Sequence, residues 1–101
     1  MTATAALHLY RIAQEAVTNA AKHSQATTVT LQADVTPERL CLRVRDNGVG
    51  IPEYPNTGAG MGLRNMRTRA TTLEAVLEIK RLSQGGTEII CTVPLDTSVH
   101  A

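Results

Sequence analysis

Apolar residues over residues 7–24 recur with the period of a helix. This segment contains no glycine or proline, and its apolar positions follow the i, i+3, i+4, i+7 spacing of an amphipathic helix. We therefore predict a helix over 7–24 and treat residues 1–6 as a featureless, disordered lead-in. The buried stripe of this helix is expected to contain Leu9, Ile12, Ala13, Ala16, Val17 and Ala20.

The same predicted helix also has a polar face. At 100° per residue, its polar side chains fall within about 100° of one another. From the helix alone, a solvated face with Arg11 and Glu15 paired at i, i+4 is favoured over a ligand site. The residues of this face are Arg11, Glu15, Thr18, Asn19 and Lys22.

Alternating apolar and polar residues predict two strands after this helix. Residues 28–35 alternate strictly, and the pattern returns from Leu40 to Asp46. The connection, residues 36–39, begins Thr-Pro, which is typical of a turn. The two strands are therefore predicted to form an antiparallel hairpin, with Val29, Leu31, Ala33 and Val35 on its buried face.

The second half of the chain repeats the order of a helix and a hairpin. Residues 52–60 contain two prolines and two glycines without periodicity, so we predict a loop. Helical spacing resumes at Met61, and two strand-like runs, 77–82 and 87–93, flank a glycine-containing turn. The expected fold is a single α/β (α+β) domain over 1–101, a two-layer sandwich. Its sheet would be mixed and mostly antiparallel, with helices on one face.

Composition narrows the possible functions. The chain has 101 residues, of which 43% are apolar and 19% are charged, as in a soluble globular domain. Only two aromatic residues and a net charge of +1 argue against nucleic acid as a partner. No apolar run reaches the ~20 residues of a membrane helix, so we expect a cytoplasmic domain without direct membrane contact. Cys41 and Cys91 lack metal-ligand spacing and are interpreted as small buried apolar residues.

The hexapeptide from Asp46 to Ile51 is a candidate ligand site. It ends a predicted strand with a carboxylate, an amide and two glycines, Gly48 and Gly50. Such glycines let the backbone approach a flat ligand, and the carboxylate can accept a hydrogen bond from an amino group. Asp-Asn-Gly is also common in hairpin turns, so the hexapeptide alone leaves both interpretations open.

A second candidate is the glycine run Gly58-Ala59-Gly60-Met61-Gly62, which precedes the second predicted helix. Free N–H groups at a helix N-terminus suit an anion such as phosphate, although a flexible linker is the alternative. A dinucleotide-binding motif is disfavoured, although Glu78 lies 20 residues after Gly58, because these glycines follow a loop and are spaced Gly-x-Gly-x-Gly. A Walker-type loop is excluded because no Gly-Lys-Ser/Thr follows.

Taken together in order, these features resemble the N, G1 and G2 boxes and the terminal Gly-Thr of the GHKL, or Bergerat-fold, ATPases. The segments 9–16, 19–24 and 62–70 are similar to the catalytic domain of sensor histidine kinases of the two-component subfamily that signals to LuxR-type response regulators. The resemblance covers residues 7–95. It implies ATP and Mg²⁺ as ligands and a protein histidine kinase activity.

For the purine, the resemblance implies that Asp46 accepts the adenine amine. Gly48 and Gly50 would make room for the ring, and Thr87 would support the pocket directly or through water. Ile51 would be a further nucleotide-binding residue.

For the phosphates, the resemblance implies that Asn19 ligates Mg²⁺ and that Glu15 orients or deprotonates a reacting water or the acceptor imidazole. Gly60 and Gly62 would close over the phosphates. Lys22, one turn beyond Asn19, can face the same charge. The remaining nucleotide-binding residues would be Gly58, Met61 and Leu63.

The resemblance also implies partners. In this family the phosphorylated histidine lies on a separate dimerising helical domain of the same kinase, so His8 and His23 are interpreted as ordinary histidines. The chain is therefore expected to be a fragment that binds ATP but lacks the acceptor and one sheet strand. The full-length protein would be a homodimer acting on a response regulator, and its membrane anchoring is left open. The rival hypotheses are an anti-sigma-type serine-protein kinase, a noncatalytic nucleotide-sensing module and a Rossmann oxidoreductase.

Overall fold

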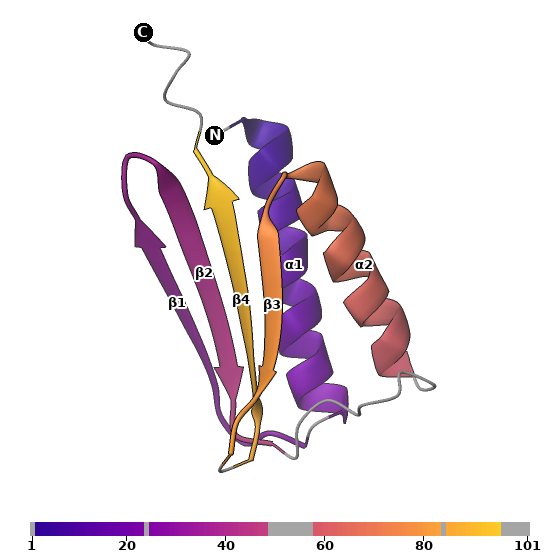
Figure 1. Ribbon diagram of the computed structural model, residues 1–101. Helices are drawn as coiled ribbons and strands as arrows, with labels where there is room; N and C mark the ends of the chain where they lie inside the picture. Colours follow the sequence, from indigo (N-terminus) through magenta and orange to yellow (C-terminus); the bar gives the residue numbers. More distant parts are fainter. Residues whose placement is uncertain (1, 24, 49–57, 84, 96–101) are drawn as a thin grey trace, which may run out of the picture.

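In the described part of the chain, two helices pack on one face of a four-stranded sheet (Figure 1). The computed structural model describes residues 2–23, 25–48, 58–83 and 85–95. The predicted order of helix, hairpin, helix and hairpin and the predicted two-layer sandwich are both confirmed. The elements are α1 (Ala3–His23), β1 (Val29–Val35), β2 (Arg39–Asp46), α2 (Gly58–Thr72), β3 (Val76–Arg81) and β4 (Thr87–Pro94).

Both helices begin earlier than the sequence pattern predicts. The start of α1 at Ala3 makes the disordered lead-in wrong for residues 3–6. Thr2 caps this helix, because its Oγ1 accepts a hydrogen bond from the Ala5 N–H at 3.0 Å, and alanine favours helix. The glycine run does not precede α2 but forms its first turns, since α2 starts at Gly58. Apolar periodicity cannot mark these turns because glycine has no side chain.

The sheet has the strand order β1-β2-β4-β3. Each of the three pairings is antiparallel, with Leu31 opposite Val44, Leu42 opposite Cys91 and Ile79 opposite Ile89. The two predicted hairpins are present, and the pairing of β2 with β4 joins them into one sheet.

The core lies between this sheet and the helices. As predicted, Ile12, Ala16 and Ala20 of α1 are buried, and Leu9, Ala13 and Val17 pack against them partly buried. From α2 the buried residues are Met66 and Ala70, and from the sheet they are Leu42, Val44, Ile89, Cys91 and Val93.

Strand β1 is less buried than its alternation predicts. Leu31 and Val35 share the helix-side face with Val44 and Leu40, yet they are 52% and 66% exposed. The helices contact chiefly β2 and β3, so they do not cover this edge strand. Alternation therefore identified the correct face of β1 but not its exposure.

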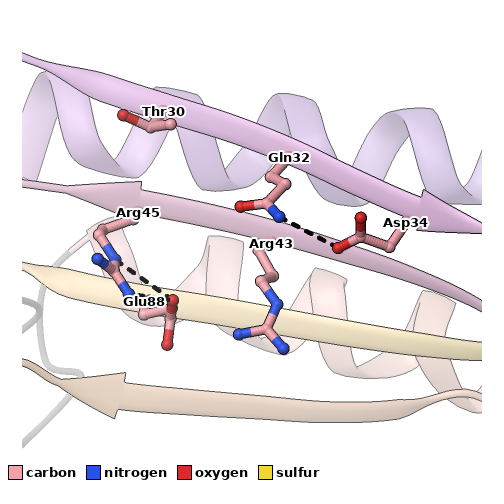
Figure 2. A pocket seen from close by; sticks show the side chains of 6 residues that line it. All are labelled: Thr30, Gln32, Asp34, Arg43, Arg45 and Glu88. Carbon is pink, nitrogen blue, oxygen red and sulfur yellow. Dashed lines mark hydrogen bonds and ion pairs between the residues drawn. The ribbon is translucent and has the colours of Figure 1, made fainter.

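The sheet face away from the helices is polar. Figure 2 shows Thr30, Gln32 and Asp34 of β1 beside Arg43 and Arg45 of β2. Glu88 of β4 lies in the same shallow depression and is only 7% exposed. Its Oε2 accepts hydrogen bonds from Nη2 and Nε of Arg45, at 2.9 and 3.3 Å.

Four segments distant in sequence meet at one end of the sandwich. In Figure 1 the C-terminal end of α1, the end of β2, the beginning of α2 and the beginning of β4 all lie at the lower end. Asp46 at the end of β2, the glycines at the start of α2 and the C-terminal part of α1 thus lie at the same end of the sandwich. Within the described ranges, no helix has the length and hydropathy to cross a membrane.

Candidate functional site

Asp46 is the last residue of β2 and lies at this end of the sandwich. It is only 8% exposed, on the side of the sheet that carries Leu42 and Val44. Its Oδ1 accepts a hydrogen bond from the Gly48 N–H at 2.8 Å, which holds the carboxylate against the following turn. A carboxylate has a second oxygen, Oδ2, which is a further acceptor for a ligand donor.

The turn between β3 and β4 packs directly against the backbone of Asp46. Gly86 has φ +96°, and a Cβ there would overlap the carbonyl oxygen of Asp46 and lie 3.0 Å from its carbonyl carbon. Only glycine combines this φ with this approach. Thr87 follows and is 1% exposed, so the predicted pocket threonine is buried beside the end of β2.

The polar face of α1 differs from the predicted ledge. Asn19 is 3% exposed, Glu15 is half-buried and Lys22 is exposed. The predicted pairing of Arg11 with Glu15 is wrong: Arg11 donates from Nη1 to Oε1 of Gln14 at 2.9 Å, and its guanidinium lies 5.9 Å from the ring centre of Tyr10. A buried amide loses hydration, so position 19 is not an ordinary solvated position.

The N-terminal end of α2 supplies backbone donors. Gly58, Gly60 and Gly62 have helical backbone. Gly58 and Gly60 lie in the first turn, where the N–H groups lack intrahelical partners, whereas Gly62 lies one residue beyond it. Leu63 is half-buried and packs against the core, so it supports this end of the helix. Gly50 and Ile51 lie outside the described residues, and of Met61 only the backbone is described.

These groups fit a nucleotide and a metal. The Asp46 carboxylate can accept from a purine amino group, and helix N–H groups can donate to phosphate oxygens. The side chain of Asn19 offers an amide oxygen, the kind of ligand that Mg²⁺ prefers. Among the described residues no three His, Cys, Asp or Glu side chains cluster as a metal site. A metal would therefore share an amide ligand with phosphates and water.

His8 and the two cysteines lie in the described part of the chain. Nη1 of Arg69 lies 3.1 Å from Nδ1 of His8, which makes His8 a contact between α2 and α1. The side chain of His23 lies outside the described residues. Cys91 is buried as predicted, whereas Cys41 is only half-buried, and both thiols are free. Burial, with a smaller effect of Cys41, raises the pKa of Cys91 to about 11.

The sequence pattern assigns no role to Asn47. Its side chain bonds to the loop that follows α1, and Oδ1 accepts from the N–H groups of Thr27 and Thr28. The only sequence signal was an asparagine in a turn, a residue type that often bonds to nearby backbone. The actual partners are distant in sequence, so this signal could not identify them.

Comparisons with known proteins agree with this arrangement. Residues 4–97 match the family described as histidine kinase-, DNA gyrase B- and HSP90-like ATPases. The chain is 40% identical to the nitrate/nitrite sensor protein NarX of Escherichia coli K12 over 87 residues, and these residues make up 86% of this chain and 14% of NarX. It is also 40% identical over 89 residues to the sensor protein VraS of Staphylococcus saprophyticus, covering 88% of this chain and 26% of VraS.

Solved structures give the same result. The histidine kinase domain of the Erythrobacter litoralis EL346 blue-light activated histidine kinase superposes with a TM-score of 0.75 and 31% identity, over 90% of this chain and 48% of that one. The ATP binding domain of PrrB from Mycobacterium tuberculosis superposes with a TM-score of 0.71 and 25% identity, over 87% of this chain and 67% of that one. The chain spans only about a seventh to a quarter of the curated relatives NarX and VraS. Because residues 4–97 match this family and the fold agrees with its solved members, the chain belongs to the histidine kinase-, DNA gyrase B- and HSP90-like ATPase family.

Proposed function

We propose that this chain is the ATP-binding catalytic domain of a sensor histidine kinase. It would transfer the γ-phosphoryl group of Mg·ATP to a histidine on a separate dimerisation domain of the same protein. The observation that carries the proposal is the convergence of three chemistries at one end of the sandwich. These are the Asp46 carboxylate, the buried Asn19 amide and the N-terminal end of α2.

At the purine end, the Asp46 carboxylate accepts the adenine amine. Its orientation is supported by the Gly48 N–H and by the close approach of Gly86 to its backbone. Gly48 would leave room for the ring and Thr87 would support the pocket, and we assign Gly50 and Ile51, which lie outside the described residues, to nucleotide binding as well. A carboxylate acceptor favours adenine over guanine, because guanine presents a carbonyl oxygen where adenine presents its amine.

At the phosphate end, Asn19 would hold Mg²⁺ through its amide oxygen and Lys22 would face the phosphate charge. Mg²⁺ when bound neutralises the charge that develops on the transferred phosphoryl group. Glu15 orients the attacking group or accepts its proton. Both Asn19 and Glu15 are on α1, and a rigid helix fixes their separation.

The glycine-opened end of α2 covers the phosphates. Gly58, Gly60 and Gly62 let the backbone approach them closely, and the helix N-terminus favours their negative charge. Met61 and Leu63 complete the nucleotide-binding set. The site therefore has a positive end, the N-terminus of α2, for the phosphates and a negative end, the Asp46 carboxylate, for the purine amine.

The partners follow from the relatives. NarX and VraS are sensor proteins, so we propose a longer homodimeric kinase with its own phosphoacceptor domain and a LuxR-type response regulator as the next acceptor. The domain would act in the cytoplasm, where ATP is available, without binding nucleic acid or contacting the membrane itself. The solved relative from Erythrobacter litoralis is described as a histidine kinase domain, and this favours histidine over serine phosphorylation and catalysis over nucleotide sensing.

Labelling of the full-length protein with γ-labelled ATP tests the activity. We expect acid-labile, base-stable phosphate, which is typical of phosphohistidine, and its loss in Glu15→Gln and Asn19→Ala variants. Acid-stable phosphoserine would contradict the histidine assignment. ATP binding without any labelling would leave the noncatalytic module as the function.

A further inference from the structure

The side chain of Asn47 joins two segments that are far apart in sequence. Its Oδ1 accepts from the N–H groups of Thr27 and Thr28, each at 3.0 Å, and its Nδ2 donates to Thr27 Oγ1 at 2.9 Å. The Asn47 N–H also donates to the Thr28 carbonyl at 3.3 Å. Asn47 itself is exposed, so these bonds, not core packing, define its role.

The loop held by Asn47 is tied in turn to α1. The Ala26 N–H donates to the carbonyl of Ala20 at 3.2 Å. A hydrogen-bonded path therefore runs from the residue after Asn19, through residues 26–28, to the residue after Asp46. Asn19 and Asp46 are the residues that the proposed function places at opposite ends of the nucleotide.

We propose that Asn47 is a positioning residue that sets the spacing between the metal-phosphate end and the purine end of the site. This inference rests on the proposed function. A ligand that engages both ends gains affinity when their separation is already fixed, because less freedom is lost on binding. A ligand that engages one end gains nothing from that spacing. Asn47 should therefore matter for Mg·ATP and not for adenosine.

The decisive pair of variants is Asn47→Ala and Asn47→Asp in the 101-residue chain. Alanine removes all three side-chain bonds. Aspartate keeps an oxygen acceptor for both N–H groups, and the Thr27 hydroxyl can rotate to donate to its second oxygen. The positioning role predicts that aspartate rescues what alanine loses.

Thr36→Ala is the matched control. Thr36 Oγ1 accepts from the N–H groups of Glu38 and Arg39, at 3.3 and 3.1 Å, in the turn at the other end of the same hairpin. Like Asn47→Ala, this variant frees two backbone donors. If a general loss of stability weakened Mg·ATP binding, both variants would bind more weakly. If the spacing between Asn19 and Asp46 is what matters, only Asn47→Ala would bind Mg·ATP more weakly.

Calorimetry with Mg·ATP and with adenosine measures the effect, and amide hydrogen exchange at Thr27 and Thr28 reports the bonds themselves. We expect Asn47→Ala to weaken Mg·ATP about tenfold, the loss expected for one or two hydrogen bonds. Adenosine binding should change less than about twofold. Asn47→Asp and Thr36→Ala should bind both ligands as the parent chain does. The Thr27 and Thr28 amides should exchange faster only in the alanine variant.

Three results would overturn the inference. These are unchanged Mg·ATP affinity in Asn47→Ala, equal losses for adenosine and Mg·ATP, or no rescue by Asn47→Asp while its Thr27 and Thr28 amides stay protected. If the parent chain binds neither ligand, the proposed function itself fails and the inference fails with it. Ligand binding by the parent chain therefore distinguishes a failure of the proposed function from a failure of the positioning role of Asn47.

Discussion

Replacing Gly86 by alanine tests the packing that supports Asp46. Two effects act at this position. A non-glycine residue at φ +96° is strained by about 1–3 kcal/mol. The new methyl group would also overlap the Asp46 carbonyl, and forcing atoms into packed space costs about 1–3 kcal/mol more. The sum, about 2–6 kcal/mol, is a large part of the 5–15 kcal/mol that stabilises a typical domain.

Gly85→Ala is the control that separates the two effects. Gly85 has the same φ of +96°, but its Cβ would lie 3.4 Å from the Gly48 carbonyl oxygen, an ordinary contact. Urea unfolding followed by circular dichroism should therefore show Gly86→Ala to be less stable than Gly85→Ala by about 1–3 kcal/mol. Equal free energies of unfolding in the two variants would refute the proposed contact with Asp46.

Four further predictions concern the rest of the fold. Arg45→Ala should lower the free energy of unfolding by about 1–2 kcal/mol, because it leaves the nearly buried carboxylate of Glu88 without its ion pair; an unchanged urea midpoint would contradict this. Met66→Ala should cost about 2–5 kcal/mol, because Met66 is fully buried between the layers; a thermal midpoint within a degree of the parent would show that the site collapses without loss. The raised pKa of Cys91 favours its neutral thiol in the folded state, so this contribution to stability is complete below pH 9 and is lost as the pH rises towards 11, as unfolding curves across this range would show. Folded protein at pH 8 should accordingly react with a thiol reagent at Cys41 before Cys91, and equal rates would contradict the burial of Cys91.

The local pattern predicted the elements because each carries its own periodicity. Ile12 and Ala16 follow the helical stripe and are buried, and Leu42 and Val44 alternate along β2 as expected. Asp46 could be identified as a candidate because a carboxylate followed by glycines at a strand end is an unusual combination. Local sequence was sufficient for these features.

Other features depend on contacts between distant segments. The exposure of Leu31 and Val35 depends on which strands the helices cover, and alternation reports only the face. The pairing of β2 with β4 brings Gly86 to Asp46, and no local pattern encodes that approach. Asn47 was missed for the same reason, since its partners lie 19 and 20 residues away.

The central claim is that Asp46 and Asn19 hold the two ends of one Mg·ATP molecule. Calorimetry of the parent chain, Asp46→Ala and Asn19→Ala with ATP, in the presence and absence of Mg²⁺, tests it most directly. We predict that Asp46→Ala loses the preference for ATP over GTP, whereas Asn19→Ala loses the Mg²⁺-dependent part of the affinity. Parent-like ATP binding in both variants would contradict the account.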